Sequence, residues 1–212
     1  MRALMPLLLA LTAAASPALA ADLIVTIRTA DGQPVKDAVA TLHYPGGAEN
    51  TVGAKLAGPY VVSQHGISFD PFVVVVPVGA DVTFPNKDTV RHHVYSFSPA
   101  KRFELKLYGR EDARAVKFEK VGVVALGCNI HDKMLGFVDV VDTPFVAKTD
   151  DKGEAILSDL PAGAGTLVLW QPYLKSPRNE QTHGVVIDNN THQSYVVDLR
   201  APPATMTMSM GQ

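Results

Sequence analysis

The chain has little cysteine, little net charge and few long apolar runs. It contains a single cysteine among 212 residues, so no disulfide can form within the chain. The formal net charge at pH 7 is −2, and no basic tract or interleaved aromatic pattern suggests nucleic acid as a partner. Beyond residue 20 no apolar run is long enough to cross a bilayer, so we expect no membrane span in the mature chain.

The first 20 residues are typical of an export signal. Arg2 supplies positive charge, residues 3–15 form a largely apolar run, and Ala18-Leu19-Ala20 is a small-residue cleavage site. We therefore expect a signal peptide at 1–20, cleavage after Ala20 and a periplasmic mature chain. An uncleaved membrane anchor is the alternative, although the run is short for a span.

The single cysteine lies in a segment that offers three kinds of metal ligand. Cys128, His131 and Met134 follow one another with two residues between successive members. A tight loop with this spacing can present a thiolate, an imidazole and a thioether to one ion. Exported chains usually oxidise their cysteines in pairs, so metal ligation explains how a lone thiol persists. An ordinary buried thiol is the alternative.

A second imidazole is available upstream, in Arg91-His92-His93-Val94. Two His and one Cys with a weak axial Met form the ligand set of a mononuclear blue copper centre. Adjacent residues of a strand point to opposite faces, so only one of His92 and His93 can ligate without distortion of the backbone. The sequence therefore predicts one copper ion (Cu+/Cu2+), held by one of these two His together with the three ligands of the loop.

Short β-rich segments punctuated by Gly and Pro predict an all-β molecule made of sandwiches or barrels. The predicted strands are 22–28, 34–42, 73–76, 82–84, 94–97, 121–126, 136–141, 166–170, 185–187 and 194–199, and residues 149–157 are predicted to form a turn that leads into a further strand. Residues 201–212 contain Pro and then alternate Met with polar residues, which predicts a disordered tail.

Residues 69–141 resemble a cupredoxin, the family of small Greek-key β-sandwiches that bind blue copper. The resemblance rests on Phe69-Asp70-Pro71, Val82-Thr83-Phe84-Pro85-Asn86, His92-His93-Val94, Val121-Gly122 and Cys128-Asn129-Ile130-His131-Asp132-Lys133-Met134-Leu135-Gly136. Among the amicyanin- and plastocyanin-like members, the short ligand loop is most similar to that of amicyanin. The whole arrangement is similar to exported proteins often labelled methylamine utilisation proteins.

The resemblance also implies roles for individual residues. By the family pattern His92 is the ligand, and His93 stands where an Asn is usual and lies beside the ligands. Asn86 matches a position that ties the ligand loop down by hydrogen bonding, and a turn-forming Asn before Lys87-Asp88 is the alternative. Asn129 directly follows the thiolate, and its backbone amide is expected to steady the loop.

The segments on either side resemble a carboxypeptidase regulatory-like domain, a small transthyretin-like β-sandwich. Residues 31–39 match its opening strands, and Thr149-Asp150-Asp151-Lys152-Gly153 and Leu160-Pro161-Ala162-Gly163 match its later part. Neither segment could bury a core alone. We therefore expect one discontinuous domain, residues 21–60 and 144–200, with the cupredoxin domain, residues 61–143, inserted in it.

These features predict an exported carrier of single electrons, not an enzyme, that serves transient redox partners of the dehydrogenase or cytochrome class. A copper carrier or sensor is an alternative, because the thioethers of Met206, Met208 and Met210 suit Cu(I), although such a pattern also arises by chance composition. Another alternative is an interaction module with an auxiliary copper site. Multicopper enzymes flank their Cys with His residues, whereas Gly127 and Asn129 flank Cys128.

Overall fold

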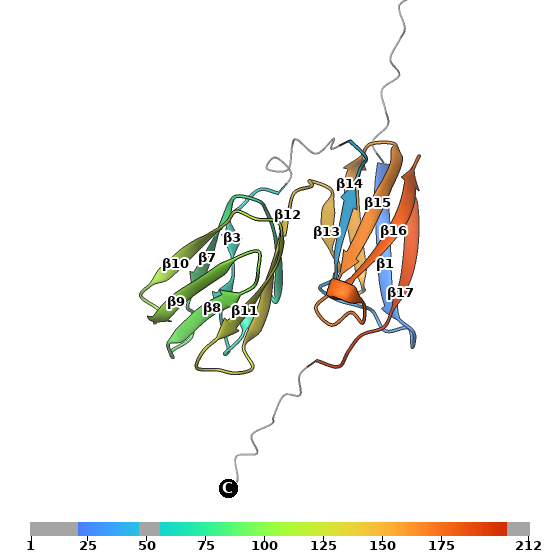
Figure 1. Ribbon diagram of the computed structural model, residues 1–212. Coiled ribbons are helices and arrows are strands. Elements are labelled where there is room, and N and C mark those ends of the chain that lie inside the picture. The colour runs from blue at the N-terminus through green and yellow to red at the C-terminus, as the bar shows by residue number, and fades with distance from the viewer. Residues whose placement is uncertain (1–20, 47–55, 203–212) are drawn as a thin grey trace, which may run out of the picture.

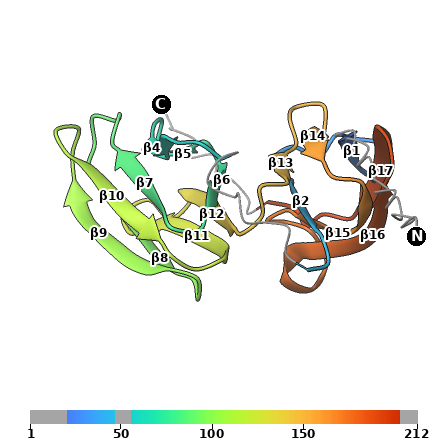
Figure 2. The same cartoon turned by 90° about the horizontal axis from the view of Figure 1, so that it is seen from above.

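The computed structural model describes residues 21–46 and 56–202, and shows two β-sandwiches side by side (Figures 1 and 2). Apart from one short 3-10 helix, η1 (Pro177–Asn179), the regular elements of these residues are strands, as the sequence predicts. No helix within the described ranges is long and apolar enough to cross a membrane. The predicted export signal and residues 203–212 of the predicted tail lie outside the described residues.

One sandwich is assembled from both ends of the described chain, and we call it the flanking sandwich. Its two sheets have the strand orders β14-β1-β17 and β13-β2-β15-β16. The N-terminal strand is the central strand of its sheet, antiparallel to β14 and parallel to β17. The strands are β1 (Ala21–Thr29), β2 (Val39–His43), β13 (Val146–Lys148), β14 (Glu154–Leu160), β15 (Gly163–Trp170), β16 (Glu180–Ile187) and β17 (Thr191–Val197).

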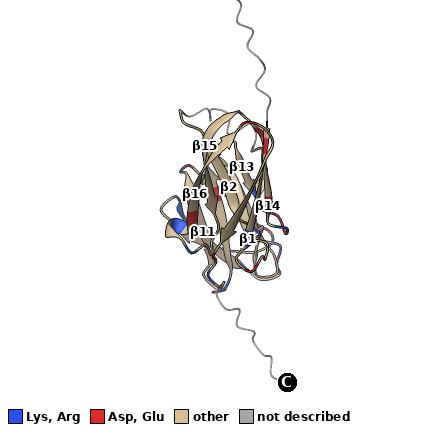
Figure 3. Cartoon of the chain, turned by 90° about the vertical axis from the view of Figure 1, so that its right-hand side faces the viewer, with Lys and Arg blue, Asp and Glu red and all other residues tan. Residues whose placement is uncertain are grey.

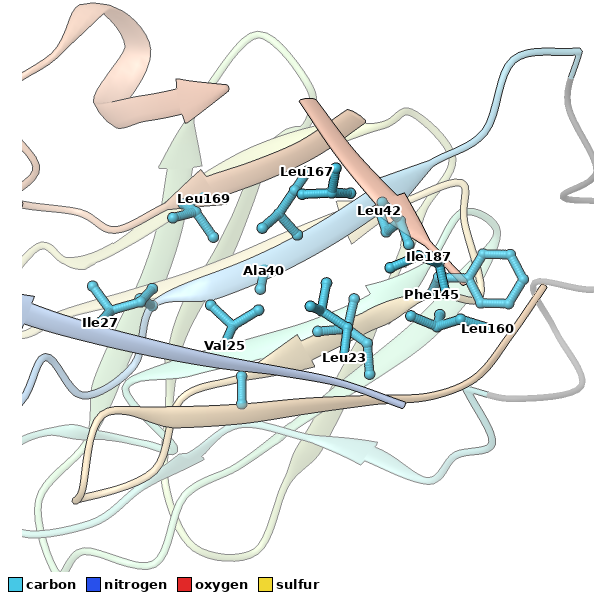
Figure 4. Close-up of a cluster of buried hydrophobic side chains, with 14 of the residues drawn as sticks. Leu23, Val25, Ile27, Ala40, Leu42, Phe145, Leu160, Leu167, Leu169 and Ile187 are labelled. Carbon is cyan, nitrogen blue, oxygen red and sulfur yellow. The ribbon is translucent and has the colours of Figure 1, made fainter. Parts of the chain in front are cut away.

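The core of the flanking sandwich draws on residues from both ends. Alternate residues of β1, namely Leu23, Val25 and Ile27, are at most 1% exposed and point into it. Figure 4 shows them facing Leu42 of β2 and residues of β15 and β16. Because one apolar cluster joins residues 21–42 with residues 145–197, the two flanking segments form a single discontinuous sandwich.

Residues between β2 and β13 form the second sandwich, which we call the inserted sandwich. Its sheets have the orders β10-β7-β3 and β6-β12-β11-β8-β9, and β4 pairs with β5. A separate apolar cluster fills it, with Phe84, Phe118 and Val94 fully buried. The strands are β3 (Tyr60–Val61), β4 (Ser63–Gln64), β5 (Phe69–Asp70), β6 (Val73–Pro77), β7 (Ala80–Pro85), β8 (His92–Phe97), β9 (Arg102–Tyr108), β10 (Ala113–Phe118), β11 (Gly122–Cys128) and β12 (Leu135–Val141).

The two sandwiches contact each other through a small apolar cluster. Val39 and Trp170 of the flanking sandwich and Val73 of the inserted one are buried together. The ring of Phe137 meets that of Trp170 edge-on, with centroids 5.5 Å apart. Nζ of Lys148 adds a polar link, because it donates to the carbonyl oxygen of Val73 at 2.9 Å. Acidic and basic residues are interspersed over the flanking sandwich, as Figure 3 shows.

Candidate metal centre

Two successive turns shape the loop that follows Cys128. Cys128 is the last residue of β11, and β12 begins at Leu135. The amide of His131 donates to the carbonyl oxygen of Cys128 at 3.4 Å, and the amide of Met134 donates to that of His131 at 2.9 Å. Each bond spans three residues, so the chain turns at the same interval as the spacing of the predicted ligands.

His92 begins β8, the strand next to β11, and its side chain is fully buried. The two strands run antiparallel with Val94 opposite Cys128, which brings the start of β8 close to the ligand loop. Nδ1 of His92 lies 3.8 Å from Sγ of Cys128, and Nδ1 of His131 lies 3.6 Å from the same sulfur. The ligand atoms of these three residues all lie within 4.8 Å of one another.

Met134 adds a buried thioether to this group. It is 3% exposed and Cys128 is 4% exposed, and both belong to the apolar cluster of the inserted sandwich. Both also line a pocket of about 670 Å³. His92, Cys128, His131 and Met134 therefore form a cluster of the kind that holds type-1 copper.

His93 points away from the cluster. Its Nε2 lies 2.8 Å from Oε1 of Glu104 on the neighbouring β9. Its carbonyl oxygen accepts the amide of Asn129 at 3.1 Å, a bond that ties the ligand loop to β8. Because side chains alternate along β8, the structure brings His92 and not His93 to the sulfur.

A carboxylate holds the far side of the His92 ring. Oδ2 of Asp88 lies 2.8 Å from Nε2 of His92, and the two oxygens of Asp88 accept the amides of Gly66 and Ile67 at 2.7 and 3.0 Å. Burial by itself raises the pKa of Asp88, but the hydrogen bonds from Ile67, His92 and Gly66 outweigh it and the pKa lies below its usual value. An ionised carboxylate keeps the proton on Nε2, which leaves the lone pair of Nδ1 facing Cys128.

Asp88 has a functional position that the sequence analysis missed. The available signal was an acidic residue four positions before a candidate ligand, but such residues are common in loops.

Asn86 fixes the loop that carries Asp88. Its Nδ2 donates to the carbonyl oxygens of Val90 and Tyr108 at 2.8 and 3.2 Å, and its Oδ1 accepts the amide of Asp88 at 2.8 Å. The bonds to Val90 and Asp88 are local ones, as in a turn-forming Asn, whereas the bond to Tyr108 joins this loop to the end of β9.

No protein-family model and no curated protein matches the chain. Among solved structures it is similar to a copper-containing nitrite reductase from Thermus scotoductus SA-01, at 28% identity and a TM-score of 0.38 over 40% of this chain, but spans only 22% of that chain. A purple cupredoxin from Nitrosopumilus maritimus is 25% identical, with a TM-score of 0.36 over 39% of this chain and 100% of its own. A variant of amicyanin in its reduced Cu(I) form is 25% identical, with a TM-score of 0.36 over 48% of this chain and 98% of its own. All three TM-scores lie below 0.5, so the case for copper depends on the positions of the ligand atoms.

Proposed function

We propose that the chain is an exported blue copper protein that passes single electrons between redox partners. The observation that carries the proposal is the convergence of the ligand atoms of His92, Cys128 and His131 within 4.8 Å. On this basis we assign residues 61–143 to a cupredoxin domain. We assign the flanking sandwich to the carboxypeptidase regulatory-like class, on the turn motifs of its sequence.

The donor set fits copper. The cluster offers two imidazoles, one thiol and a thioether, which suit a copper ion in either oxidation state, whereas Mg²⁺ and Ca²⁺ prefer oxygen ligands. The nearby carboxylate of Asp88 is turned to the outer nitrogen of His92 rather than toward the sulfur. A bound copper ion supplies the one-electron couple between Cu(I) and Cu(II).

The protein's own residues hold the donors in place. Asp88 fixes the ring of His92, and the fully buried position of that ring leaves little freedom to turn. Cys128 is fixed by its place at the end of β11, and the backbone bonds of the loop fix His131 and Met134. Donors that are positioned in advance need little rearrangement when an electron arrives or leaves.

The expected partners are transient redox proteins of the dehydrogenase or cytochrome class, met in the periplasm. Interfaces of this kind are small, below about 1,200 Å². His131 is partly exposed on the ligand loop, so its ring edge is the natural point of electron entry and exit. No imidazole adjoins Cys128 in the chain, since Gly127 and Asn129 are its neighbours, which favours an electron carrier over a multicopper enzyme.

Optical and EPR spectra of the copper-loaded, oxidised protein test the proposal. We expect an intense blue absorption in the wild-type protein, because a Cu(II)–thiolate bond gives the charge-transfer band. His92→Ala should abolish it, and His93→Ala, the matched control at the adjacent position, should keep it. A colourless oxidised protein, or a blue His92→Ala protein, would contradict the assignment.

A further inference from the structure

The flanking sandwich covers only part of the outer face of the five-stranded sheet β6-β12-β11-β8-β9. Val123 of β11 and Phe137 of β12 point away from the core of the inserted sandwich and pack against the apolar cluster between the two sandwiches. Strands β8 and β9 lie on the side away from the flanking sandwich (Figures 1 and 2). The outward side chains of these two strands are therefore left outside that contact.

Two aromatic rings stand on the uncovered part of this face. Tyr95 and Phe97 are outward residues of β8, because side chains alternate along the strand and Val94 and Ser96 are buried. Their ring centroids lie 5.1 Å apart, and Phe97 is 71% exposed. Together with Leu135 they line a groove of about 330 Å³. A contiguous apolar patch of this kind, unlike a single exposed side chain, marks an interaction site.

The ring of Tyr95 also lies against the residue that precedes Cys128. Tyr95 and Gly127 stand opposite each other on the antiparallel strands β8 and β11. A Cβ at Gly127 would meet Cζ and Oη of Tyr95 at 2.8 and 2.9 Å, so the ring needs a glycine beneath it. A molecule seated on the two rings is therefore separated from Cys128 by one aromatic ring and one glycine.

The charges of β9 on this face are mainly positive. Arg102 stands opposite Phe97, and alternate residues of the strand follow it on the same face. The carboxylate of Glu104 is paired with His93, since Oε1 lies 2.8 Å from Nε2. Arg102 and Lys106 are exposed and take part in no ion pair with the described residues. The rings are thus bordered by two cations that are open to a partner.

We propose that Tyr95, Phe97, Arg102 and Lys106, which we call the β8–β9 surface, dock a redox protein whose contact face carries carboxylates. The inference rests on the proposed function, because it names where a partner of the metal centre binds. Aromatic residues and Arg are enriched at protein interfaces, and cations beside them steer an acidic partner into place. The same sheet face already docks the flanking sandwich, so a partner here extends an existing apolar contact.

The β8–β9 surface is distinct from the ring edge of His131. That ring belongs to the loop between β11 and β12, whereas the β8–β9 surface lies on two strands. Two contact points suit a carrier that serves two proteins, because the donor need not leave before the acceptor docks. Each transfer moves one electron, so the partner is oxidised as the metal ion is reduced, and no proton or covalent bond is involved.

Hexacyanochromate(III) tests whether the β8–β9 surface receives an anion. This paramagnetic complex ion is inert and broadens the amide NMR signals of residues near which it binds. It is added at low salt to the chain from Ala21 onward, with ascorbate present so that any bound copper is diamagnetic. We expect broadening at residues 95–97 and 102–106. Arg102→Glu/Lys106→Glu should remove it, because the surface then repels the anion.

The matched control is Lys117→Glu/Lys120→Glu, which makes the same change in net charge at exposed residues of β10 and the segment after it. This variant should show the wild-type broadening at residues 95–97 and 102–106. Broadening that survives in the Arg102→Glu/Lys106→Glu protein, or that lies only elsewhere in the wild-type protein, would overturn the proposal.

Oxidation of the reduced copper protein by ferricyanide, followed by stopped flow, tests whether electrons pass at this surface. Ferricyanide takes one electron from the site and becomes ferrocyanide. At low ionic strength we expect Arg102→Glu/Lys106→Glu to react roughly threefold or more slowly than Lys117→Glu/Lys120→Glu. The difference should shrink in about 1 M salt, where the Debye length is about 3 Å. The blue absorption should stay at its wild-type value in both.

Equal rates for the two variants at low salt would overturn the role of the β8–β9 surface in electron transfer and leave the proposed function standing. A wild-type protein that never becomes blue would remove the proposed function, whereas the NMR result on the anion would stand. Sedimentation separates a partner from a second copy of the chain. We expect a monomer, and a wild-type dimer that Phe97→Ser dissociates would assign the surface to self-association and overturn the proposal.

Discussion

At the scale of single residues, the ring of His92 is held between a sulfur on one side and a carboxylate on the other. Asp88 binds Nε2 of His92 and also two backbone amides of the β4–β5 turn. The same carboxylate therefore sets the ring orientation and joins the loop before β8 to the turn beside it. The sequence predicted His92 and Cys128 because ligand types and spacing are visible in it. It did not reveal Asp88, because only the folded loop shows which acid reaches the imidazole.

Asp88→Asn should weaken copper binding by roughly 10- to 100-fold, because partners of a ligand's outer nitrogen typically contribute that much. The Asn side chain keeps the shape of Asp88 but removes its negative charge. It has one oxygen instead of two, so it cannot accept the backbone N–H groups of both Gly66 and Ile67 as the carboxylate does. Competition with a copper chelator measures the change. Asp81→Asn, at an exposed carboxylate on β7, is the control and should bind copper as the wild-type protein does. Equal affinities for both variants would show that Asp88 does not position the ligand.

At the scale of elements, the turn between β13 and β14 allows almost no side chain at its last residue. Gly153 has φ = +75°, and a Cβ there would meet the carbonyl oxygen of Ile27 at 2.5 Å and the amide nitrogen of Val35 at 3.0 Å. Its own carbonyl oxygen accepts the amide of Ile27 at 2.8 Å. The turn signal in Thr149–Gly153 was visible in the sequence, whereas the close approach of β1 was not, because β1 lies more than a hundred residues away.

Gly153→Ala should lower the free energy of unfolding of the flanking sandwich by roughly 2–4 kcal/mol, from the left-handed backbone and the overlap with backbone atoms. Urea unfolding followed by the fluorescence of Trp170, the only Trp in the chain, measures it. Gly184→Ala on β16 is the matched control, since a Cβ there meets nothing within 4 Å. The blue absorption should survive in folded Gly153→Ala protein, because the ligands belong to the other core. A loss similar to that of Gly184→Ala would contradict this account.

At the scale of the whole molecule, much of the fold could be predicted, because most strands are marked by alternating apolar residues and are bounded by Gly or Pro. β9 and β10 were not predicted. Their alternate residues are charged, as in Arg102-Phe103-Glu104-Leu105-Lys106, and the apolar half of the pattern is short and interrupted. The contact between the sandwiches could not be predicted either. Val39, Val73 and Trp170 are apolar residues of strands, and nothing in the sequence distinguishes a residue buried between the two sandwiches from one buried within a sandwich.

The junction of the sandwiches contains a buried acid. Asp139 of β12 is 7% exposed and lines a cavity of about 130 Å³, together with Glu180, His43 and Asp142. Burial raises the pKa of Asp139 to about 7, and the negative charge of Glu180 acts in the same direction. The folded protein therefore keeps a proton that the unfolded chain releases above a pH of roughly 4.

Stability should fall as the pH rises from about 4 to about 7, since in this range the folded state binds one more proton than the unfolded state. The free energy of unfolding should fall by roughly 4 kcal/mol at most over this range, since each pH unit contributes about 1.4 kcal/mol for one bound proton. Asp139→Asn, which is neutral throughout, should remove this part of the pH dependence and unfold at a higher temperature than the wild-type protein at pH 7.5. Asp142→Asn changes an exposed acid beside the same cavity and should keep the wild-type slope. If the stability of the wild-type and Asp139→Asn proteins changes with pH in the same way between pH 4 and 7.5, Asp139 does not keep its proton in the folded protein.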